Sequence, residues 1–415
     1  MQEDWASAWQ TSDRGEPLAN LFNAMVTLRN HPAMKSILRY DQMAMAATLW
    51  GQIPGAPADP NTPRHVTDAD VLAIQEAMQR VGMKRVARAT VDDAVSLRAV
   101  ETSYHPVRDY LNALVWDGQP RVDNWLCYYL GTEPKETASE ATQHRQLRYF
   151  RKIGRLFLIA MVARVMKPGC KADYMMILEG PQGALKSSAC AVLAGDYFSS
   201  NLPDLSRGDM VRVQMHLRGK WLIEIGELAS FSAAEAETLK AFVTQTEEQY
   251  VAKYAHREVR EPRQCLFIGS TNQSAYLRDP TGGRRFWPVP VGIIDLESLR
   301  QDRDQLFAEA VHLYQAGEKW WPDRQFEAEF IAPEQSARYE ADVWHDTIET
   351  WLRVNNILQC TVSEVLTEAL HMSVNQTSTR EQRRVAGILT QMGWTLHRTM
   401  NKRNYVKPSH TEFSV

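Results

Sequence analysis

The chain has no closely spaced cysteine pair. Its five cysteines are scattered singly through 415 residues, and no two of them have the C-x-x-C spacing. This distribution argues against a disulfide framework and against a zinc site, and it is typical of a reducing compartment. The five residues are Cys127, Cys170, Cys190, Cys265 and Cys360.

Long hydrophobic runs are also missing. The longest, Leu156 to Ala163, is too short to cross a bilayer and is flanked by Arg155 and Arg164. We expect it to form a buried helix, and we expect no membrane partner. The first ten residues have the pattern of neither a signal peptide nor a transit peptide.

A charge excess of either sign is absent as well. The formal net charge is −3, with 44% hydrophobic and 23% charged residues, so no basic field covers the whole chain. Any surface for nucleic acid must therefore be local. The length allows two or three domains with proper cores, and no internal repeat or low-complexity tract is visible.

The chain does contain a candidate phosphate-binding loop. An apolar strand from Tyr174 to Leu178 precedes two glycines, a lysine, two serines and a run of small residues. Backbone N–H groups at a helix start suit phosphate oxygens, glycines let the backbone approach them, and a lysine reaches the β and γ phosphates. The residues expected to bind ATP are Gly180, Pro181, Gln182, Gly183, Ala184, Leu185, Lys186, Ser187 and Ser188.

Leu185 departs from the strict motif, which has glycine before the lysine. The alternative interpretation is an ordinary strand–turn–helix corner with a surface lysine. The nucleotide interpretation therefore depends on the segments downstream of the loop.

Two acids close a second apolar run about forty residues later. Glu224 and Glu227 lie in the segment Lys220 to Leu228, and carboxylates on a buried strand are costly unless they are paired or bind metal. With Ser187 they form a candidate Mg²⁺ ligand set, and we favour Glu227 as the residue that polarises water. The alternative is a strand end with two solvated acids.

Two further segments complete a candidate catalytic site. Asn272 ends an apolar strand and is suited to contact the γ-phosphate and the attacking water, although an asparagine turn after a strand is common. Arg284 and Arg285 follow a Gly-Gly turn, and one of them would be the arginine that neutralises charge at a neighbour's γ-phosphate. The alternative is a basic turn with surface ion pairs.

Between the acidic segment and the strand before Asn272, polar and apolar residues alternate from Tyr250 to Pro262, as they do in a β-hairpin. Its basic residues would face a central channel and contact the phosphates of single-stranded DNA. A charged, exposed hairpin with no ligand is the alternative. The residues concerned are Lys253, His256, Arg257 and Arg260.

In combination, these motifs resemble the virulence-associated protein E (VirE/VapE-like) family. The pieces are E-G-x-Q-G-x-x-K-S, W-h-x-E-h-x-E-L (h is apolar), a Lys-Tyr hairpin, G-S-T-N, and D-x-x-G-x-R-R-F-W-P-V, in that order. The resemblance covers about residues 100 to 330 and includes the segment from His105 to Gly131, where short helices are expected. The family tolerates a residue other than glycine before the loop lysine.

The resemblance implies a phage or mobile-island ATPase related to the superfamily three helicases of the AAA+ class. It implies ATP and Mg²⁺ as cofactors, a homo-oligomeric ring, expected to be a hexamer, and a place in the cytoplasm of a bacterial host. By position, Lys186 and Ser187 become loop ligands, Glu224 and Glu227 the acidic pair, and Asn272 the sensor; Arg284 or Arg285 becomes the arginine finger.

The fold class expected is α/β. From about 172 to 330, short strands (174–178, 221–225, 265–270 and 286–291) alternate with helices, which indicates a mostly parallel sheet in a P-loop AAA+/RecA-like core. Residues 1–115 are expected to be a mainly helical domain, with a Pro/Gly-rich loop over 51–64. Residues 116–171 would form a helical connector whose long helix spans about 143–166.

Residues 345–415 are expected to be a winged helix-turn-helix. Thr361 and Glu364 form a candidate capping box, and a helix and hairpin between 380 and 407 carry seven basic residues and one acid. This basic helix and hairpin favour contact with DNA, including a double-stranded origin. The alternative is a winged helix that binds protein or packs on the ATPase domain as a cap. The DNA-contacting candidates are Arg380, Arg383, Arg384, Arg398, Lys402 and Arg403.

The sequence thus favours an ATP-dependent DNA helicase or translocase that acts in replication of a mobile element. The alternative is a DNA-binding replication-initiation or regulatory protein on a weak or degenerate NTPase scaffold. A terminase-like or regulatory ATPase without unwinding activity is a third interpretation.

Overall fold

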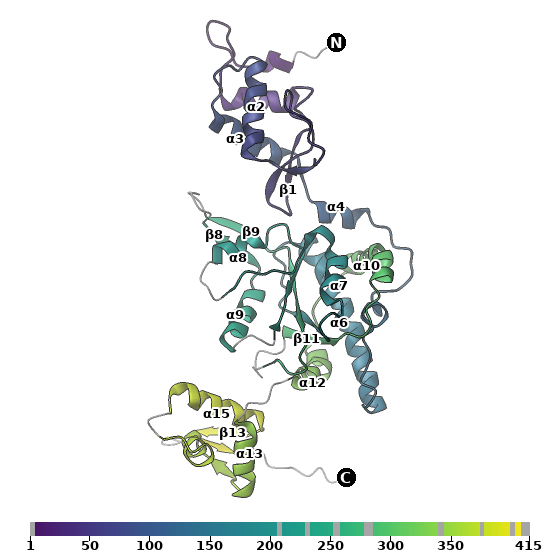
Figure 1. Cartoon of the computed structure of the whole chain (residues 1–415), viewed down its shortest axis with the longest axis vertical. Helices are drawn as coiled ribbons and strands as arrows, with labels where there is room; N and C mark the ends of the chain where they lie inside the picture. The colour runs from purple at the N-terminus through teal and green to yellow at the C-terminus, as the bar shows by residue number, and fades with distance from the viewer. Residues whose placement is uncertain are drawn as a thin grey trace.

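A five-stranded sheet lies at the centre of the computed structural model, between an N-terminal and a C-terminal group of elements along the long axis of the molecule (Figure 1). The structure describes residues 5–205, 210–228, 233–251, 258–277, 285–338, 344–373, 377–398 and 403–407. The strand order is β11-β5-β10-β7-β6, and every neighbouring pair is parallel. The strands are β5 (Met175–Glu179), β6 (Phe198–Ser199), β7 (Leu222–Ile225), β10 (Leu266–Thr271) and β11 (Phe286–Pro290).

Helices cover both faces of this sheet. Met176 and Leu178 of β5 point into a core shared with α6 (Glu140–Met166), α7 (Lys186–Ala194) and α10 (Leu296–Gln315). Met175 and Ile177 point to the other face, against α8 (Met210–His216) and α9 (Ala233–Val243). Burial on both faces explains why the strands are nearly continuous apolar runs, as parallel strands are in α/β proteins. The predicted α/β class and parallel sheet are confirmed.

The four strands expected in this part of the chain agree with the structure to within one or two residues. The predicted buried helix around Leu156 to Ala163 is also present, as the second half of α6. Among the described residues, none of the helices has the length and apolar character needed to cross a membrane. The remaining elements here are α4 (Pro106–Ala113), α5 (Trp125–Leu130), η2 (Gly195–Tyr197), β8 (Glu247–Tyr250), β9 (Val259–Pro262), α11 (Arg324–Phe326), η5 (Glu327–Ile331) and α12 (Ala332–Ser336).

The N-terminal part contains a sheet that the sequence did not reveal. Four short strands in the order β3-β2-β1-β4 join three α-helices, and α3 packs on β1 and β2. The expectation of a mainly helical region was therefore incomplete. Strands of two to four residues are too short to show the alternation of apolar and polar residues by which a strand is recognised in a sequence. The elements are η1 (Trp5–Ala8), α1 (Leu21–Asn30), β1 (Leu38–Asp41), β2 (Ala46–Leu49), β3 (Arg64–His65), α2 (Asp68–Arg80), α3 (Arg88–Glu101) and β4 (Ser103–Tyr104).

Backbone and side-chain hydrogen bonds join this N-terminal part to the amino ends of the central strands. The Gln264 amide donates to the Gln42 carbonyl at 2.9 Å, and the Gly219 N–H donates to the Met43 carbonyl at 2.9 Å. His105 Nε2 lies 2.6 Å from the Gln264 side-chain oxygen. The N-terminal elements therefore sit at the edge of the sheet where the strands begin.

The C-terminal part is a small helical unit with a three-stranded sheet. The Thr361 and Glu364 capping box is present, and Val385, Ile388 and Leu389 of α15 are buried as their spacing predicts. The sheet order is β12-β14-β13, with both pairs antiparallel. The elements are α13 (His345–Val354), β12 (Gln359–Cys360), α14 (Val362–Glu364), η6 (Val365–Ala369), α15 (Thr379–Gln391), β13 (Thr395–Arg398) and β14 (Arg403–Val406).

Candidate nucleotide-binding site

An open cleft of about 490 Å³ lies at the carboxyl ends of the central strands. This volume is in the range of small-molecule sites, and the carboxyl edge is where open α/β sheets bind their ligands. Most of the residues expected from the sequence line it. The lining consists of Gln182, Gly183, Ala184, Leu185, Lys186, Ser187, Ser188, Ser200, Glu224, Gly226, Glu227, Ser270, Thr271 and Asn272.

Strand register brings these distant segments together. Thr271 pairs with Glu179, so Asn272 follows at the level of the first loop residue, Gly180. The Gly180 N–H donates to the Thr271 carbonyl at 3.1 Å, which ties the loop to β10. On the other side of β10, Ile268 pairs with Glu224, one residue before β7 ends. The loop, the acid and the asparagine thus share one edge.

The backbone conformation of the loop bears on two residues, Gly183 and Leu185, the latter standing where the strict motif has glycine. Gly183 has φ 83°, a left-handed conformation that glycine adopts without penalty. Leu185 caps α7 with φ 60° and ψ 19°, also left-handed, and its side chain is 47% exposed. A leucine there costs about 1–2 kcal/mol relative to glycine. The chain therefore keeps the phosphate-loop conformation without the usual glycine.

Lys186 is bonded to its own loop. Its Nζ donates to the Gly180 carbonyl at 2.7 Å and to the Pro181 carbonyl at 2.9 Å. Burial lowers the pKa of the Lys186 ammonium, and the Glu224 carboxylate opposes part of that shift. The ammonium thus lies at the helix start, where a phosphate group is favoured by the backbone N–H groups.

Ser187 and Glu224 form a set of oxygen donors that fits Mg²⁺. The Ser187 hydroxyl donates to Glu224 Oε1 at 2.9 Å. Glu224 is only 3% exposed, and its second oxygen, Oε2, is buried without a hydrogen-bond partner among the described residues. Mg²⁺ prefers one or two carboxylates together with phosphate oxygens, so a carboxylate with one oxygen bonded to a hydroxyl and the other without a partner is a suitable place for it.

Glu227 and Asn272 lie on the same cleft but are exposed to solvent. Glu227 has φ 53°, which is uncommon for a residue other than glycine and often marks a functional position. Both residues are in reach of a ligand in the cleft.

The structure does not bring Arg285 to this cleft. Arg285 precedes β11, and Phe286 pairs with Met175 at the amino end of β5. The length of β5 separates it from the loop, roughly 15 Å at 3.3 Å per residue. Arg284 lies outside the described residues. Within one chain, Arg285 and the loop are therefore on opposite edges of the sheet.

The predicted DNA hairpin is present at its base as the antiparallel pair β8–β9. Arg260 is exposed on β9 and forms an ion pair with Glu258 at 3.7 Å. The base is anchored by the buried pair of Arg263 with Glu248. The tip candidates Lys253, His256 and Arg257 lie outside the described residues.

Exposed arginines gather on the last helix and hairpin. Arg383 and Arg384 are exposed on α15, and Arg384 lies 3.9 Å above the Trp344 ring. Arg398 and Arg403 are exposed and directly opposite each other on β13 and β14. Facing like charges destabilise a hairpin unless an anion lies between them. Arg380 is on α15, and Lys402 lies outside the described residues.

Sequence reasoning missed a buried group next to the loop. Arg338 forms three hydrogen bonds of 2.9 to 3.1 Å with the carboxylate of Glu179, the last residue of β5, and also pairs with Glu334. Burial by itself lowers the pKa of Arg338, but the bonds to Glu179 and the charge of Glu334 raise it above its ordinary value. Since 159 residues separate the partners, no local pattern marks them.

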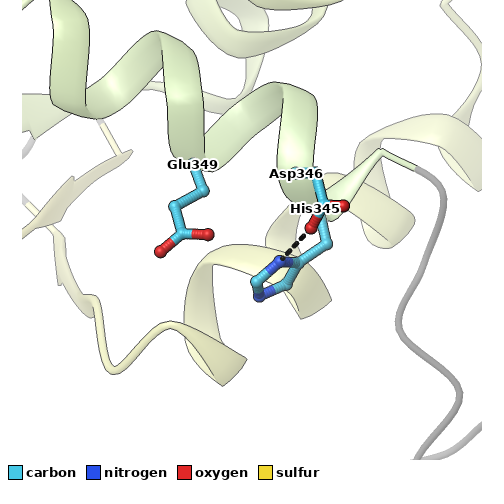
Figure 2. A group of neighbouring side chains, drawn as sticks. All are labelled: His345, Asp346 and Glu349. Carbon is cyan, nitrogen blue, oxygen red and sulfur yellow. Dashed lines mark ion pairs between the residues drawn. The ribbon is translucent and has the colours of Figure 1, made fainter.

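One further group has side chains of the types that bind metals. His345, Asp346 and Glu349 lie in the first turns of α13, with His345 Nδ1 3.5 Å from Asp346 Oδ1 (Figure 2). The two acids are exposed. Acids in this position stabilise a helix through its dipole, which accounts for their presence without a metal.

The loop, Glu224, Glu227 and Asn272 therefore line one cleft at the carboxyl edge of the parallel sheet of an α/β protein. The model of the virulence-associated protein E-like domain matches residues 111–340, more than half of the chain. The chain therefore belongs to the VapE-like family. The family resemblance of its motifs is confirmed. No curated protein matches the chain.

Solved structures show distant similarity. The apo structure of the NrS-1 C-terminal region has a TM-score of 0.42 at 15% sequence identity, covering 89% of this chain and 95% of that chain. A second, A-form apo structure of that region has a TM-score of 0.40 at 15% identity, covering 89% and 96%. A mutant of RuvB from Thermotoga maritima has a TM-score of 0.23 at 14% identity, covering 61% and 90%.

We expect the substitution Leu185→Gly to preserve the loop. The substitution removes the strain of a left-handed leucine, about 1–2 kcal/mol. Glycine also gives the unfolded chain more conformational entropy, which offsets about 0.5–1 kcal/mol of that gain in stability. The free energy of unfolding in urea should stay equal or rise by up to about 1.5 kcal/mol. Affinity for a fluorescent ATP analogue should be at least as high as in the native chain.

Gly183→Ala is the matched control. A Cβ at Gly183 meets no atom within 4 Å, so only its φ of 83° opposes the change. This variant should lose about 1 kcal/mol of stability. If Leu185→Gly instead loses stability, the leucine side chain makes contacts that outweigh the backbone strain.

Proposed function

We propose that this protein is an ATP-dependent DNA helicase or translocase that acts in replication of a phage or mobile genetic element. The observation that carries the proposal is the convergence of Lys186, the Ser187–Glu224 pair and Asn272 on one cleft. Membership of the VapE-like family supports it. The proposed cofactors are ATP and Mg²⁺.

In this mechanism Lys186 exchanges the Gly180 and Pro181 carbonyls for the β and γ phosphates. Ser187 and Glu224 would hold Mg²⁺, and the ion would supply positive charge against the phosphates. Glu227 polarises the attacking water, and Asn272 orients that water against the γ-phosphate. Each role is assigned to a side chain that lines the same cleft.

The position of Arg285 favours an oligomer. An arginine on the edge of the sheet opposite the loop cannot complete the site of its own chain, but it can complete that of a neighbour in a ring. A head-to-tail arrangement of identical subunits closes into such a ring. We propose a homo-oligomer, expected to be a hexamer, in which Arg284 or Arg285 acts as the finger.

The last part of the chain supports a DNA-binding role. Three successive helical segments (α13, α14 with η6, and α15) precede the β13–β14 hairpin, which is the outline of a winged helix-turn-helix. The exposed arginines of α15 and the hairpin supply positive charge for phosphates. Single-stranded DNA in a channel and double-stranded DNA at the winged helix are the proposed partners.

A second candidate is a DNA-binding initiation or regulatory protein on a weak NTPase scaffold. The strained Leu185 in the loop is the observation that favours it. Steady-state ATP hydrolysis with and without single-stranded DNA separates the two. The helicase proposal requires hydrolysis that DNA stimulates, and a strand-displacement assay then separates unwinding from other ATPase functions.

Lys186→Ala should abolish DNA-stimulated ATP hydrolysis, with a loss of at least about 100-fold, because the phosphate charge loses its nearest cation. Lys171→Ala is the control, since the Lys171 side chain is exposed and its one described ion pair is with Asp173 at 3.0 Å. The Lys171 carbonyl, which accepts a hydrogen bond from Trp320 Nε1, is kept in this variant. Its hydrolysis rate should match that of the native chain. Normal hydrolysis by Lys186→Ala would contradict the site assignment.

A mixing experiment tests the shared site. Lys186→Ala and the double variant Arg284→Ala/Arg285→Ala should each be inactive alone. Mixed subunits should recover part of the ATPase activity, because some interfaces then join an intact loop to an intact finger. Absence of recovery, with mixed oligomers verified by mass spectrometry, would refute a finger supplied by a neighbour.

Salt dependence tests the C-terminal DNA contact. Removing Arg398 and Arg403 together should lower the slope of log affinity against log salt by about 2 for duplex DNA, at about 0.9 per phosphate. Arg353→Ala removes an exposed charge from α13, outside α15 and the hairpin, and should leave the slope unchanged. Equal slopes for the double variant and the native chain would show that the β13–β14 hairpin does not contact the DNA phosphates.

A further inference from the structure

Asn272 lies on an exposed span of chain that is anchored at both ends. Residues 272–274 follow β10 directly and are exposed to solvent, whereas Tyr276 and Leu277 are each only 6% exposed. Residues 272–276 belong to no helix or strand, so no regular hydrogen-bonding pattern holds them in place. The position of Asn272 in the cleft therefore depends on the contacts made at the two ends of this span.

The first anchor is the end of β10. The Gly180 N–H donates to the Thr271 carbonyl at 3.1 Å, and the Gln273 N–H donates to the Thr271 hydroxyl at 3.1 Å. These bonds join the first residue of the phosphate loop to the residue that precedes Asn272. One side of Asn272 is thus held against the loop.

The second anchor is made by Tyr276 and Leu277. The Tyr276 hydroxyl donates to Glu179 Oε1 at 2.8 Å, and the N–H groups of Tyr276 and Leu277 donate to the Arg338 carbonyl at 3.0 and 3.1 Å. Glu179 is the last residue of β5 and directly precedes Gly180. The two anchors therefore attach the span to adjacent residues at the start of the phosphate loop.

The carboxylate that receives the Tyr276 hydroxyl is itself held in one place. Arg338 Nε lies 2.9 Å from Glu179 Oε1, and Arg338 Nη2 lies 2.9 Å from Glu179 Oε2. Arg338 Nη1 donates to the Glu334 carboxylate, which also accepts from the Gln146 amide at 3.1 Å. Arg338 is 4% exposed and Glu334 is 2% exposed. A buried polar network with its partners in place is rigid, so it gives Tyr276 a fixed acceptor.

The bond from Tyr276 to Glu179 can be removed without leaving a buried charge unpaired. Burial raises the pKa of the Tyr276 hydroxyl well above its ordinary value, so the hydroxyl keeps its proton and donates it to the carboxylate. Glu179 Oε1 also accepts from Arg338, and this second bond remains when the hydroxyl is absent. Tyr276→Phe therefore releases one contact of the span and keeps the buried ion pair.

We propose that Tyr276 is a positioning residue whose hydroxyl bond to Glu179 holds Asn272 opposite the phosphate loop. The inference deepens the proposed function and rests on it, because Asn272 is assigned there to the γ-phosphate and the attacking water. Nucleotide binding is assigned to side chains of the loop and of β7, which lie outside the anchored span. A loosened span should therefore slow hydrolysis and leave nucleotide affinity unchanged.

The kinetics of Tyr276→Phe in the full chain test this inference. The kcat of DNA-stimulated ATP hydrolysis should fall at least about 5-fold, because a misplacement of about 1 Å can cost up to about 100-fold in rate. The Kd for adenylyl imidodiphosphate with Mg²⁺ should stay within about twofold of the native value, since the lost interaction acts in the transition state and not in binding.

Tyr174→Phe is the matched control. The Tyr174 hydroxyl donates to Glu327 Oε1 at 2.8 Å, so this variant also removes a hydrogen bond between a tyrosine and a glutamate. Tyr174 precedes β5 and is therefore at the end of that strand opposite the loop. Its kcat and its affinity for the analogue should match those of the native chain.

A double-mutant cycle separates positioning from general loosening of the domain. Asn272→Ala alone should lower kcat, because it removes the side chain that the span positions. Adding Tyr276→Phe to Asn272→Ala should change kcat by less than about twofold, since residues that act through one another are not additive. A purely structural role of Tyr276 predicts the full further loss.

The possible results point to different conclusions. No ATP hydrolysis by the native chain, with or without single-stranded DNA, means that the proposed function fails and the inference with it. A native kcat in Tyr276→Phe or in Asn272→Ala overturns the positioning role alone. An equal loss in Tyr174→Phe, or a full further loss in the double variant, also overturns it. If Tyr276→Phe does not fold, Glu179→Gln, which keeps the side-chain shape and weakens the acceptor, is judged by the same criteria.

Discussion

The parallel pairing of β10 between β5 and β7 is the constraint on which the cleft depends. Two strand spacings, about 10 Å, separate β5 from β7. Ser187 nevertheless reaches Glu224 at 2.9 Å, because the first turn of α7 extends over the end of the strand between them. That intervening strand places Asn272 between the loop and the acid. A different strand order would keep every motif and lose the site.

Motifs carried by local segments could be predicted from the sequence, and contacts between distant segments could not. The strands of the central sheet are runs of apolar residues long enough to be recognised; the loop and Asn272 directly follow such runs, and Glu224 lies within one. The N-terminal strands have two to four residues and show no period. Glu179 begins the E-G-x-Q-G-x-x-K-S motif, but its pairing with Arg338 depends on the tertiary fold, and no local pattern indicates that partner.

The two edges of the central sheet have different neighbours. The carboxyl edge carries the cleft and, through Glu179 and Arg338, the connection toward α13. The amino edge carries Arg285 and the contacts of Gln264 and Gly219 with the N-terminal elements. In sequence, Arg338 at the carboxyl edge is six residues from Trp344, which precedes α13. The two edges of the sheet therefore carry different parts of the chain.

The hydrogen bonds of Lys186 to two loop carbonyls have a consequence for ligand selection. The ammonium already has internal acceptors, so an incoming molecule competes with the protein itself for this cation. Neutral carbonyls are weaker acceptors than ionised oxygens, by roughly twofold in bond strength. A nucleoside or a monophosphate that does not extend to Lys186 gains nothing from displacing them. Under the proposed function, Lys186 therefore favours ligands whose charged phosphate tail is long enough to reach it.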